Sequence, residues 1–162
     1  MSPDPNRPIR KHARLREYDY STPAAYYVTI CTFDKRMIFG NVTDGHVHPS
    51  TLGQVAIEWW NEIPSMWPGV ELDAFVLMPN HIHGILNIIE APTKQPKLGR
   101  MVSWYKAAVT KANRRRGGDP NAVIWQSKFY DHVVRDERDL ERIRAYIAFN
   151  PGRWSEDEYY GG

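Results

Sequence analysis

The sequence predicts an α+β fold in which one antiparallel sheet carries helices on one face. Two observations lead to this prediction. The spacing of apolar residues alternates along the chain between the two-residue period of strands and the longer period of helices. These segments follow the order β-α-β-β-α-β, with one more helix at the C-terminal end. This order is that of a ferredoxin-like (split βαβ) fold, expected as one domain over residues 21–162 after a polar, basic leader at residues 1–20.

The first half of the chain is expected to form a strand, a hairpin or loop, a helix and two further strands. In the first strand apolar and polar residues alternate, and β-branched and aromatic residues are frequent. The helix has apolar residues at helical spacing and is ended by Pro64 and Pro68, because proline lacks a backbone donor. Its tryptophans, Trp59, Trp60 and Trp67, are expected in the core. In chain order the elements are predicted over residues 26–32, 41–49, 52–67, 71–78 and 81–89.

The second half is predicted to hold a loop with two prolines, a basic helix closed by two glycines, and a short strand. These lie, in order, over residues 90–97, 98–116 and 132–135. Asp136 can then cap a last helix that runs to about Phe149. Pro151 ends this helix because the residue before a proline, Asn150, disfavours the helical conformation.

The composition is that of an ordinary globular protein, with 42% hydrophobic and 25% charged residues. The longest apolar runs are about five residues, far short of a membrane span. The N-terminal residues 1–16 contain no apolar stretch, so no secretory signal is expected. The single cysteine, Cys31, excludes an internal disulfide and fits a reducing compartment. We therefore expect a cytoplasmic, nucleoid-associated protein with no membrane partner, and Cys31 as a small buried residue on a strand.

Basic residues are segregated along the chain. No Lys or Arg lies between Arg36 and Lys94, whereas residues 94–118 hold eight of them and no acid. A phosphate-binding face needs such segregation, because neutralised phosphates release their counterions. The alternative is a solvated helix face and a mobile tail. The residues expected to contact a nucleic-acid backbone are Arg14, Arg16, Lys106, Lys111, Arg114, Arg115 and Arg116.

Two histidines open the third predicted strand of the sheet. Side chains alternate along a strand, so His81 and His83 point to one face while Ile82 enters the other. Two neutral imidazoles that converge can hold a metal ion if a third ligand comes from elsewhere. The alternative is a pair of polar strand-edge residues. His46 and His48 have the same spacing but lie among turn residues, and we expect them to be a solvated pair.

The last predicted helix carries a polar stripe. Arg142, Tyr146 and Asn150 are four residues apart and share one face. Arg142 could hold a phosphate, and Asn150 could offer its amide oxygen to a metal ion. A tyrosine at helical spacing is more often a core residue than a nucleophile. The polar neighbours of Tyr146 favour the second interpretation.

Four motifs occur in order along the chain. They are Met78-Pro-Asn-His-Ile-His-Gly84, Trp125-Gln126, Tyr130-Asp-His-Val-Val-Arg135 and Tyr146-Ile-x-x-Asn-Pro151. Together they resemble the single-tyrosine HUH transposase family, in the branch of the REP-associated tyrosine transposases and their insertion-sequence relatives. The resemblance covers roughly residues 26–154. It implies a ferredoxin-like sheet carrying His81 and His83, with Tyr146 on a helix packed close to them.

The resemblance also implies the chemistry. Tyr146 is the implied nucleophile, and His81, His83 and Asn150 are the implied ligands of Mg²⁺ or Mn²⁺. Family members attack a phosphate of single-stranded DNA, form a 5′-phosphotyrosine and release a 3′-hydroxyl. Their substrates are typically single strands with hairpins, such as REP-like palindromes. Relatives outside this branch carry Gln at the position of Asn150.

Other aromatic residues match supporting positions of the family. Tyr105 is expected to pack or stack, and Trp125 and Tyr130 to support the active site or contact a base. We therefore expect Tyr146 to be the nucleophile rather than Tyr105 or Tyr130.

Three functions remain open from the sequence. The first is a transposase that nicks and rejoins single-stranded DNA. The second is a non-catalytic protein that binds single-stranded nucleic acid and would not need Tyr146. The third is a metal-dependent phosphodiesterase that uses water and leaves no covalent adduct. The chain is expected to act as a monomer with its site in cis or as a homodimer, with no other protein partner required.

Overall fold

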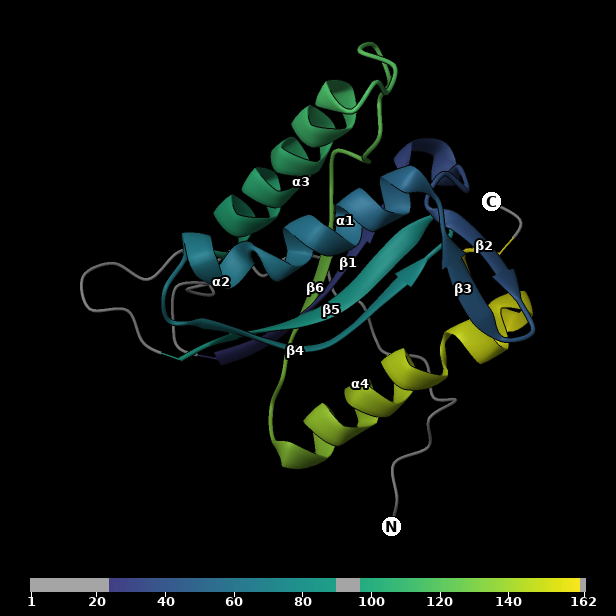
Figure 1. Ribbon diagram of the computed structural model, residues 1–162. Coiled ribbons are helices and arrows are strands. Elements are labelled where there is room, and N and C mark those ends of the chain that lie inside the picture. The colour runs from purple at the N-terminus through teal and green to yellow at the C-terminus, as the bar shows by residue number, and fades with distance from the viewer. Residues whose placement is uncertain (1–23, 90–96, 161–162) are drawn as a thin grey trace.

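Four antiparallel strands form the central sheet, in the order β4-β5-β1-β6 (Figure 1). Their bounds are Ala24–Cys31 for β1, Val70–Met78 for β4, His81–Ile88 for β5 and Tyr130–Val133 for β6. The computed structural model describes residues 24–89 and 97–160. The predicted leader, with Arg14 and Arg16, and nearly all of the predicted 90–97 loop lie outside the described residues.

The strand order confirms the predicted ferredoxin-like topology. β1 connects to β4 through a helical crossover, and β5 lies between these two strands. Three helices cover one face of the sheet: α1 at Thr51–Asn61, α2 at Ile63–Met66 and α3 at Leu98–Arg115. A fourth helix, α4 at Glu137–Phe149, crosses the opposite face (Figure 1). None of the described helices combines the length and apolar character needed to cross a membrane.

The connections at one end of the sheet hold the remaining short elements. A turn of 3-10 helix, η1 at Phe33–Lys35, follows β1, and a second, η2 at Pro151–Glu156, follows α4. The predicted hairpin is present as a separate two-stranded sheet of β2, Gly40–Thr43, and β3, His46–Pro49. His46 and His48 are both exposed on β3, as expected for a solvated pair.

The single helix predicted over residues 52–67 is wrong in one respect, because two helices occupy this range. α1 begins after Ser50, whose hydroxyl accepts a hydrogen bond from the Gly53 amide at 3.0 Å. The chain breaks at Glu62, and Pro64 falls in the first turn of α2, where proline is tolerated. Trp60 is buried, whereas Trp59 and Trp67 are half-buried and pack against Trp104.

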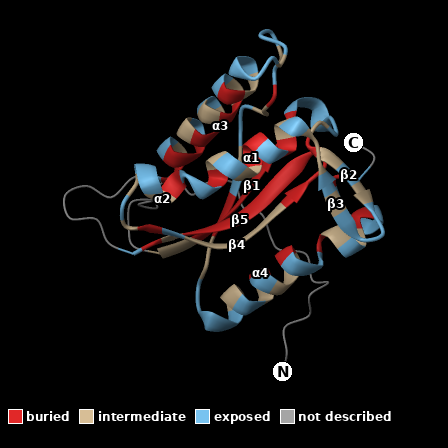
Figure 2. Cartoon of the chain, in the orientation of Figure 1, coloured by how far each residue is buried: buried red, intermediate tan, exposed pale blue. Residues whose placement is uncertain are grey.

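The sheet divides the buried interior into two parts, one on the side of α1 and α3 and one on the side of α4 (Figure 2). Tyr26, Val28 and Ile30 belong to the large core under α1 and α3. Tyr27 belongs to a small apolar cluster under α4, whose other buried members are Ile85, Ile143 and Ile147. Most of the apolar burial therefore lies on one side of the sheet. Cys31 is buried at the end of β1, as predicted.

The strand predicted at residues 132–135 lies two residues earlier, at Tyr130–Val133. It stops because the Arg135 amide donates to the Asp139 carboxylate, at 3.1 Å, instead of to a neighbouring strand. Asp136 caps α4 as predicted, since its carboxylate accepts a hydrogen bond from the Asp139 amide at 2.8 Å. The helix ends at Phe149, also as predicted.

Candidate metal and tyrosine site

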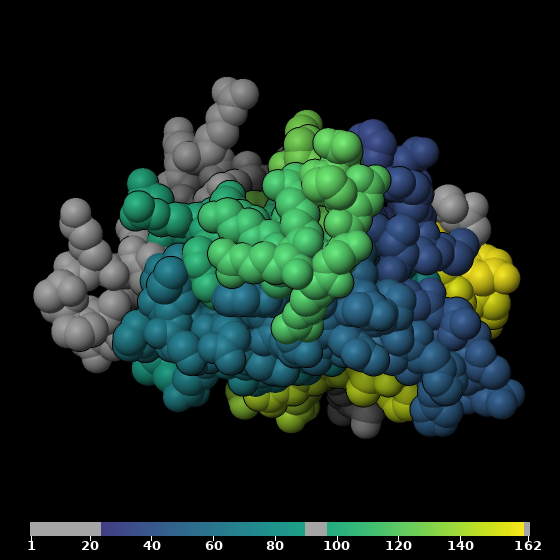
Figure 3. Space-filling view, turned by 45° about the horizontal axis from the view of Figure 1, so that its top comes forward, coloured from purple at the N-terminus to yellow at the C-terminus, as the bar shows by residue number. Residues whose placement is uncertain are grey.

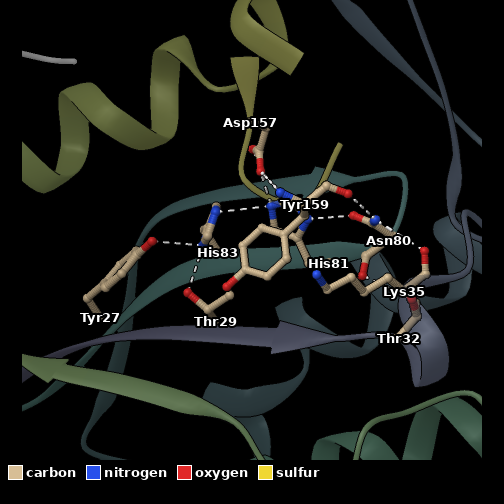
Figure 4. Close-up of polar contacts among 9 residues, drawn as sticks. All are labelled: Tyr27, Thr29, Thr32, Lys35, Asn80, His81, His83, Asp157 and Tyr159. Carbon is tan, nitrogen blue, oxygen red and sulfur yellow. Dashed lines mark hydrogen bonds and ion pairs between the residues drawn. The ribbon is translucent and has the colours of Figure 1, made fainter. Parts of the chain in front are cut away.

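The two histidines of β5 form a buried pair. His81 and His83 are both 0% exposed, and their Nε2 atoms lie 3.1 Å apart (Figure 4). Both side chains point to the α4 face of the sheet, as the two-residue period predicts. The sequence therefore placed this pair correctly on one face.

Polar neighbours hold the other ring nitrogens. His81 Nδ1 lies 2.8 Å from Asn80 Oδ1, and His83 Nδ1 lies 2.8 Å from Tyr27 Oη and 2.9 Å from Thr29 Oγ1. An amide oxygen can only accept, so it favours the tautomer in which His81 Nδ1 carries the proton. The Nε2 lone pair of His81 is then directed at His83. Such outer hydrogen bonds orient histidine ligands in metal sites.

A carboxylate completes a group of three donors. Asp157 Oδ2 lies 3.7 Å from His81 Nε2, and ligand atoms of Asp157, His81 and His83 all lie within 4.8 Å of one another. A proton can join the two Nε2 atoms at 3.1 Å, and a divalent cation can instead be bound by both imidazoles and the carboxylate. The donor set therefore fits a divalent metal ion.

Sequence reasoning missed Asp157. The residue stands in the run Ser155-Glu-Asp-Glu158, where no spacing relates it to the histidines. Asp157 reaches the beginning of β5, where the histidines lie, through η2 and the turn after it. Acidic residues in the C-terminal segment were the one signal that could have pointed to it.

Asn150, the predicted third ligand, is buried directly after the end of α4. Its side chain is 5% exposed, and its Oδ1 has no hydrogen-bond partner among the described residues. A buried carbonyl oxygen without a partner is costly, and a bound cation would satisfy it. Asn150 as a metal ligand therefore stays a prediction, with this oxygen in its favour.

Tyr146 lies beside the histidine pair. It is half-buried on α4, and its ring lies 5.6 Å from the His83 ring, centroid to centroid, with 65° between the planes. Burial, and then the negative charges of Asp157 and Glu158, raise the pKa of Tyr146 to about 12, while a hydrogen bond with Asn150 acts in the opposite direction. The phenol is therefore neutral at pH 7.

The C-terminal segment covers the site. The Tyr159 ring lies 4.4 Å from the His81 ring, and the Asn80 amide donates to the Tyr159 carbonyl at 2.8 Å (Figure 4). Tyr159 is only 7% exposed, and Trp154 lies 6.1 Å from His81, ring to ring. The histidines are thereby shielded from solvent.

The predicted DNA-binding residues of the basic helix differ in their surroundings. Lys111, Arg114 and Arg115 are exposed at the C-terminal half of α3, which stands out over α1 in Figure 3. Arg116 is also exposed and pairs with Glu58 at 2.7 Å. Lys106 is different, because its ammonium donates to the Gln126 carbonyl at 2.7 Å.

The remaining predicted residues lie on several different elements. Trp125 is half-buried, and its indole donates to the Lys106 carbonyl at 3.1 Å. Tyr130 is 39% exposed at the start of β6. Arg142 binds the Asp139 carboxylate at 2.7 Å. Tyr105 packs in the core, as expected, with its hydroxyl donating to the Ala56 carbonyl at 2.7 Å.

Related sequences are known in Haemophilus influenzae. No protein-family profile matches the chain. An uncharacterized H. influenzae protein is 33% identical over 169 aligned residues, which cover 93% of this chain and 93% of that protein. A candidate REP-associated tyrosine transposase of the same organism is 27% identical over 89 residues, about half of each chain.

Two solved structures share the fold. A REP-associated tyrosine transposase bound to a REP hairpin superposes with a TM-score of 0.65 and 21% identity, covering 88% of this chain and 74% of its own. A candidate transposase from Deinococcus radiodurans gives a TM-score of 0.53 and 18% identity, covering 85% and 96%. The predicted resemblance to the REP-associated tyrosine transposases is thereby confirmed.

Proposed function

We propose that this chain cleaves and rejoins single-stranded DNA. The premise is that it forms one family with the uncharacterized H. influenzae protein and has the fold of the REP-associated tyrosine transposases. The observation that carries the proposal is the contact between Tyr146 and the buried histidine pair. A non-catalytic binding protein has no need of a phenol at that place.

In the proposed reaction the Tyr146 oxygen attacks a backbone phosphorus. The new Tyr146 O–P bond forms as the P–O3′ bond breaks, giving a 5′-phosphotyrosine and a strand that ends in a 3′-hydroxyl. The phenol loses its proton, and the leaving 3′-oxygen gains one. Attack by another 3′-hydroxyl reverses the step and joins new ends without an external energy source.

His81 and His83 would hold the metal ion through Nε2, with Asp157 or Asn150 as the third ligand. A bound Mg²⁺ or Mn²⁺ ion supplies charge that stabilises the phosphate oxygens as negative charge develops on them. Imidazole ligands suit Zn²⁺ better than Mg²⁺, so the ligand types alone do not identify the ion. Asn80, Tyr27 and Thr29 keep the rings oriented, and their loss should weaken metal binding.

Activation of the phenol is the main chemical task of the site. With a pKa of about 12, only about one Tyr146 in 10⁵ is ionised at pH 7. A metal ion held by the histidines would favour the phenolate by its charge, and the hydrogen bond from Asn150 also favours the phenolate. Asn150 can thereby assist Tyr146 whether or not it binds the metal ion.

The substrate that we propose is a single strand with a hairpin, like the REP hairpin bound by the structural neighbour. The exposed cations of α3 would contact the backbone of the stem or strand. Trp125, Tyr130, Lys106 and Arg142 are proposed to act nearer the strand, as support or as direct contacts. The cis contact between Tyr146 and His83 favours a monomer.

A covalent-capture assay tests the proposal. Oligonucleotides from palindromes near the coding sequence, labelled at either end, are incubated with the protein and Mn²⁺ or Mg²⁺ and run on a denaturing protein gel. We expect a metal-dependent adduct on the strand 3′ of the cut, and its loss in Tyr146→Phe and His81→Ala. Tyr105→Phe, another buried tyrosine, is the matched control for fold integrity.

The same gel separates the other two functions. Cleavage without an adduct that survives Tyr146→Phe would identify the phosphodiesterase. Hairpin binding that is unaffected by Tyr146→Phe, with no cleavage of any strand, would identify the non-catalytic binder.

A further inference from the structure

The turn after β1 lies beside the histidine pair and is tied to it. The Asn80 side chain accepts from His81 at 2.8 Å and donates to the carbonyl of Lys35 at 3.2 Å. Thr32 also stabilises this turn, because its hydroxyl donates to the Arg36 carbonyl at 2.8 Å. One amide side chain therefore positions both a proposed metal ligand and the turn Phe33–Arg36.

The turn directs a cation at the site. The Lys35 side chain runs beneath Tyr159, with its ammonium 5.8 Å from the centre of that ring (Figure 4). The Tyr159 ring in turn lies 4.4 Å from the His81 ring. Lys35 is otherwise exposed. The Tyr159 ring thus lies close to both the ammonium and the His81 ring.

The backbone of the turn is strained where it carries this cation. Asp34 and Lys35 have φ angles of 54° and 51°, the left-handed region that glycine adopts at no cost. Residues with a Cβ atom disfavour this conformation. Neither residue is glycine, so this turn carries side chains where the backbone conformation favours glycine.

The same turn carries an exposed aromatic ring, that of Phe33. Phe33 is 49% exposed, and the Arg36 guanidinium lies over its ring at 5.7 Å. Arg36 is itself fixed by a hydrogen bond to the Val123 carbonyl. In Figure 3 the purple atoms of this part of the chain lie beside the light-green atoms of the segment around the end of α3. A cation and an aromatic face are the two parts of a single-strand binding surface.

We infer that the turn Phe33–Arg36 holds the DNA strand at the point of cleavage, with Lys35 contacting the phosphate that enters the histidine site and Phe33 stacking on an adjacent base. The inference rests on the proposed function. When the strand enters, the phosphate takes the place of the Tyr159 ring, which lies close to both Lys35 and His81. Lys35 then adds a positive charge on the phosphate where negative charge develops during attack by Tyr146.

The test distinguishes a specific contact made by Lys35 from the general effect of losing one positive charge. Lys35→Met keeps the length of the side chain and removes its charge, and Lys35→Arg keeps the charge. Lys97→Met is the matched control, because Lys97 is exposed and precedes α3, which begins near α2 (Figure 1). Lys35→Gly relieves the left-handed strain, so it should be folded with an unchanged or higher Tm while losing the same contact.

Two readouts are measured for each variant. The first is the rate of adduct formation at saturating DNA with Mn²⁺. We expect a loss of at least about tenfold for Lys35→Met and Lys35→Gly, about threefold or less for Lys35→Arg and none for Lys97→Met. The second is the affinity for the same oligonucleotide in EDTA as a function of salt, where loss of one phosphate contact lowers the slope of log K against log salt by about 0.7.

A third comparison locates the phosphate. Oligonucleotides with a neutral methylphosphonate at successive positions are tested with wild type and Lys35→Met. At the contacted phosphate alone, the difference in affinity between the two proteins should disappear.

Unchanged adduct rate and unchanged salt slope in a folded Lys35→Met protein would overturn the inference. Absence of an adduct from the wild type would instead refute the proposed function. In that case the salt slope in EDTA still decides whether Lys35 contacts a phosphate.

Discussion

The ring of Tyr146 contacts the ring of His83 within one chain, at 5.6 Å between centroids. The proposed nucleophile and a proposed metal ligand therefore meet without a second copy. Mixing Tyr146→Phe protein with His83→Ala protein should restore no adduct, because neither chain has a complete site. Recovery of activity in the mixture, measured by covalent capture, would mean that sites are assembled between two chains.

The pKa of Tyr146 predicts how the reaction responds to pH. Since burial raises this pKa to about 12, the ionised fraction grows about tenfold for each pH unit between 7 and 9. The rate of adduct formation at saturating Mn²⁺ should rise with the same sign, by up to about tenfold per unit. Single-turnover rates across this range are the measurement. A flat profile would show that loss of the phenol proton does not limit the step.

Metal binding should stabilise the folded chain. Adding Mn²⁺ at about 100 times its Kd is expected to contribute about 2.7 kcal/mol to the free energy of unfolding, seen as a rise in Tm. His81→Ala should abolish the rise. Asp157→Asn and Asn150→Ala compare the two candidates for the third ligand, and the true ligand is the one whose loss reduces the shift.

Asn80 gives a finer test in the same thermal assay. Replacement by Ala removes the acceptor of His81 Nδ1 and should weaken Mn²⁺ binding by about 10- to 100-fold. Gln54→Ala, at an exposed position on α1, is the control that should leave the metal response unchanged. An equal Mn²⁺-induced rise in Tm in Asn80→Ala and Gln54→Ala would contradict the orienting role of Asn80.

The position of Gly84 should not accommodate any side chain. A Cβ there would lie 2.2 Å from Cζ2 of Trp60, a ring buried in the large core. Gly84→Ala is expected to lower the free energy of unfolding by about 1–3 kcal/mol, measured by urea denaturation. Gly152→Ala is the matched control, since a Cβ there meets nothing within 4 Å. Similar midpoints for both variants would mean that Trp60 can move aside cheaply.

The sequence was most informative where a local period decides the structure. The alternation of β5 placed His81 and His83 on one face, and the helical spacing placed Tyr146 and Asn150 on one side of α4. Asp157 could not be found in this way, because its place depends on the turn after η2 and on the bond from Asn80 to Tyr159. Local patterns carry no information about such contacts.

Charge patterning gave a similarly partial result. The run of cations after residue 94 correctly indicated an exposed basic end of α3, with Lys111 and Arg114 open to solvent. Lys106 belongs to the same run, yet its ammonium is bound to the Gln126 carbonyl. Sequence spacing alone cannot tell these two situations apart, because the segment that meets Lys106 is twenty residues away.

The small apolar cluster under α4 has a consequence for how the molecule opens. α4 is held by Ile143 and Ile147 and by surface pairs such as Arg144 with Asp73, whereas the large core lies beyond the sheet. Amide hydrogens of α4 should therefore exchange with solvent through a partial opening that leaves β1 and β5 protected. Because α4 carries Tyr146, such an opening would also separate the phenol from His83, so attack on a DNA strand requires α4 to be packed against the sheet.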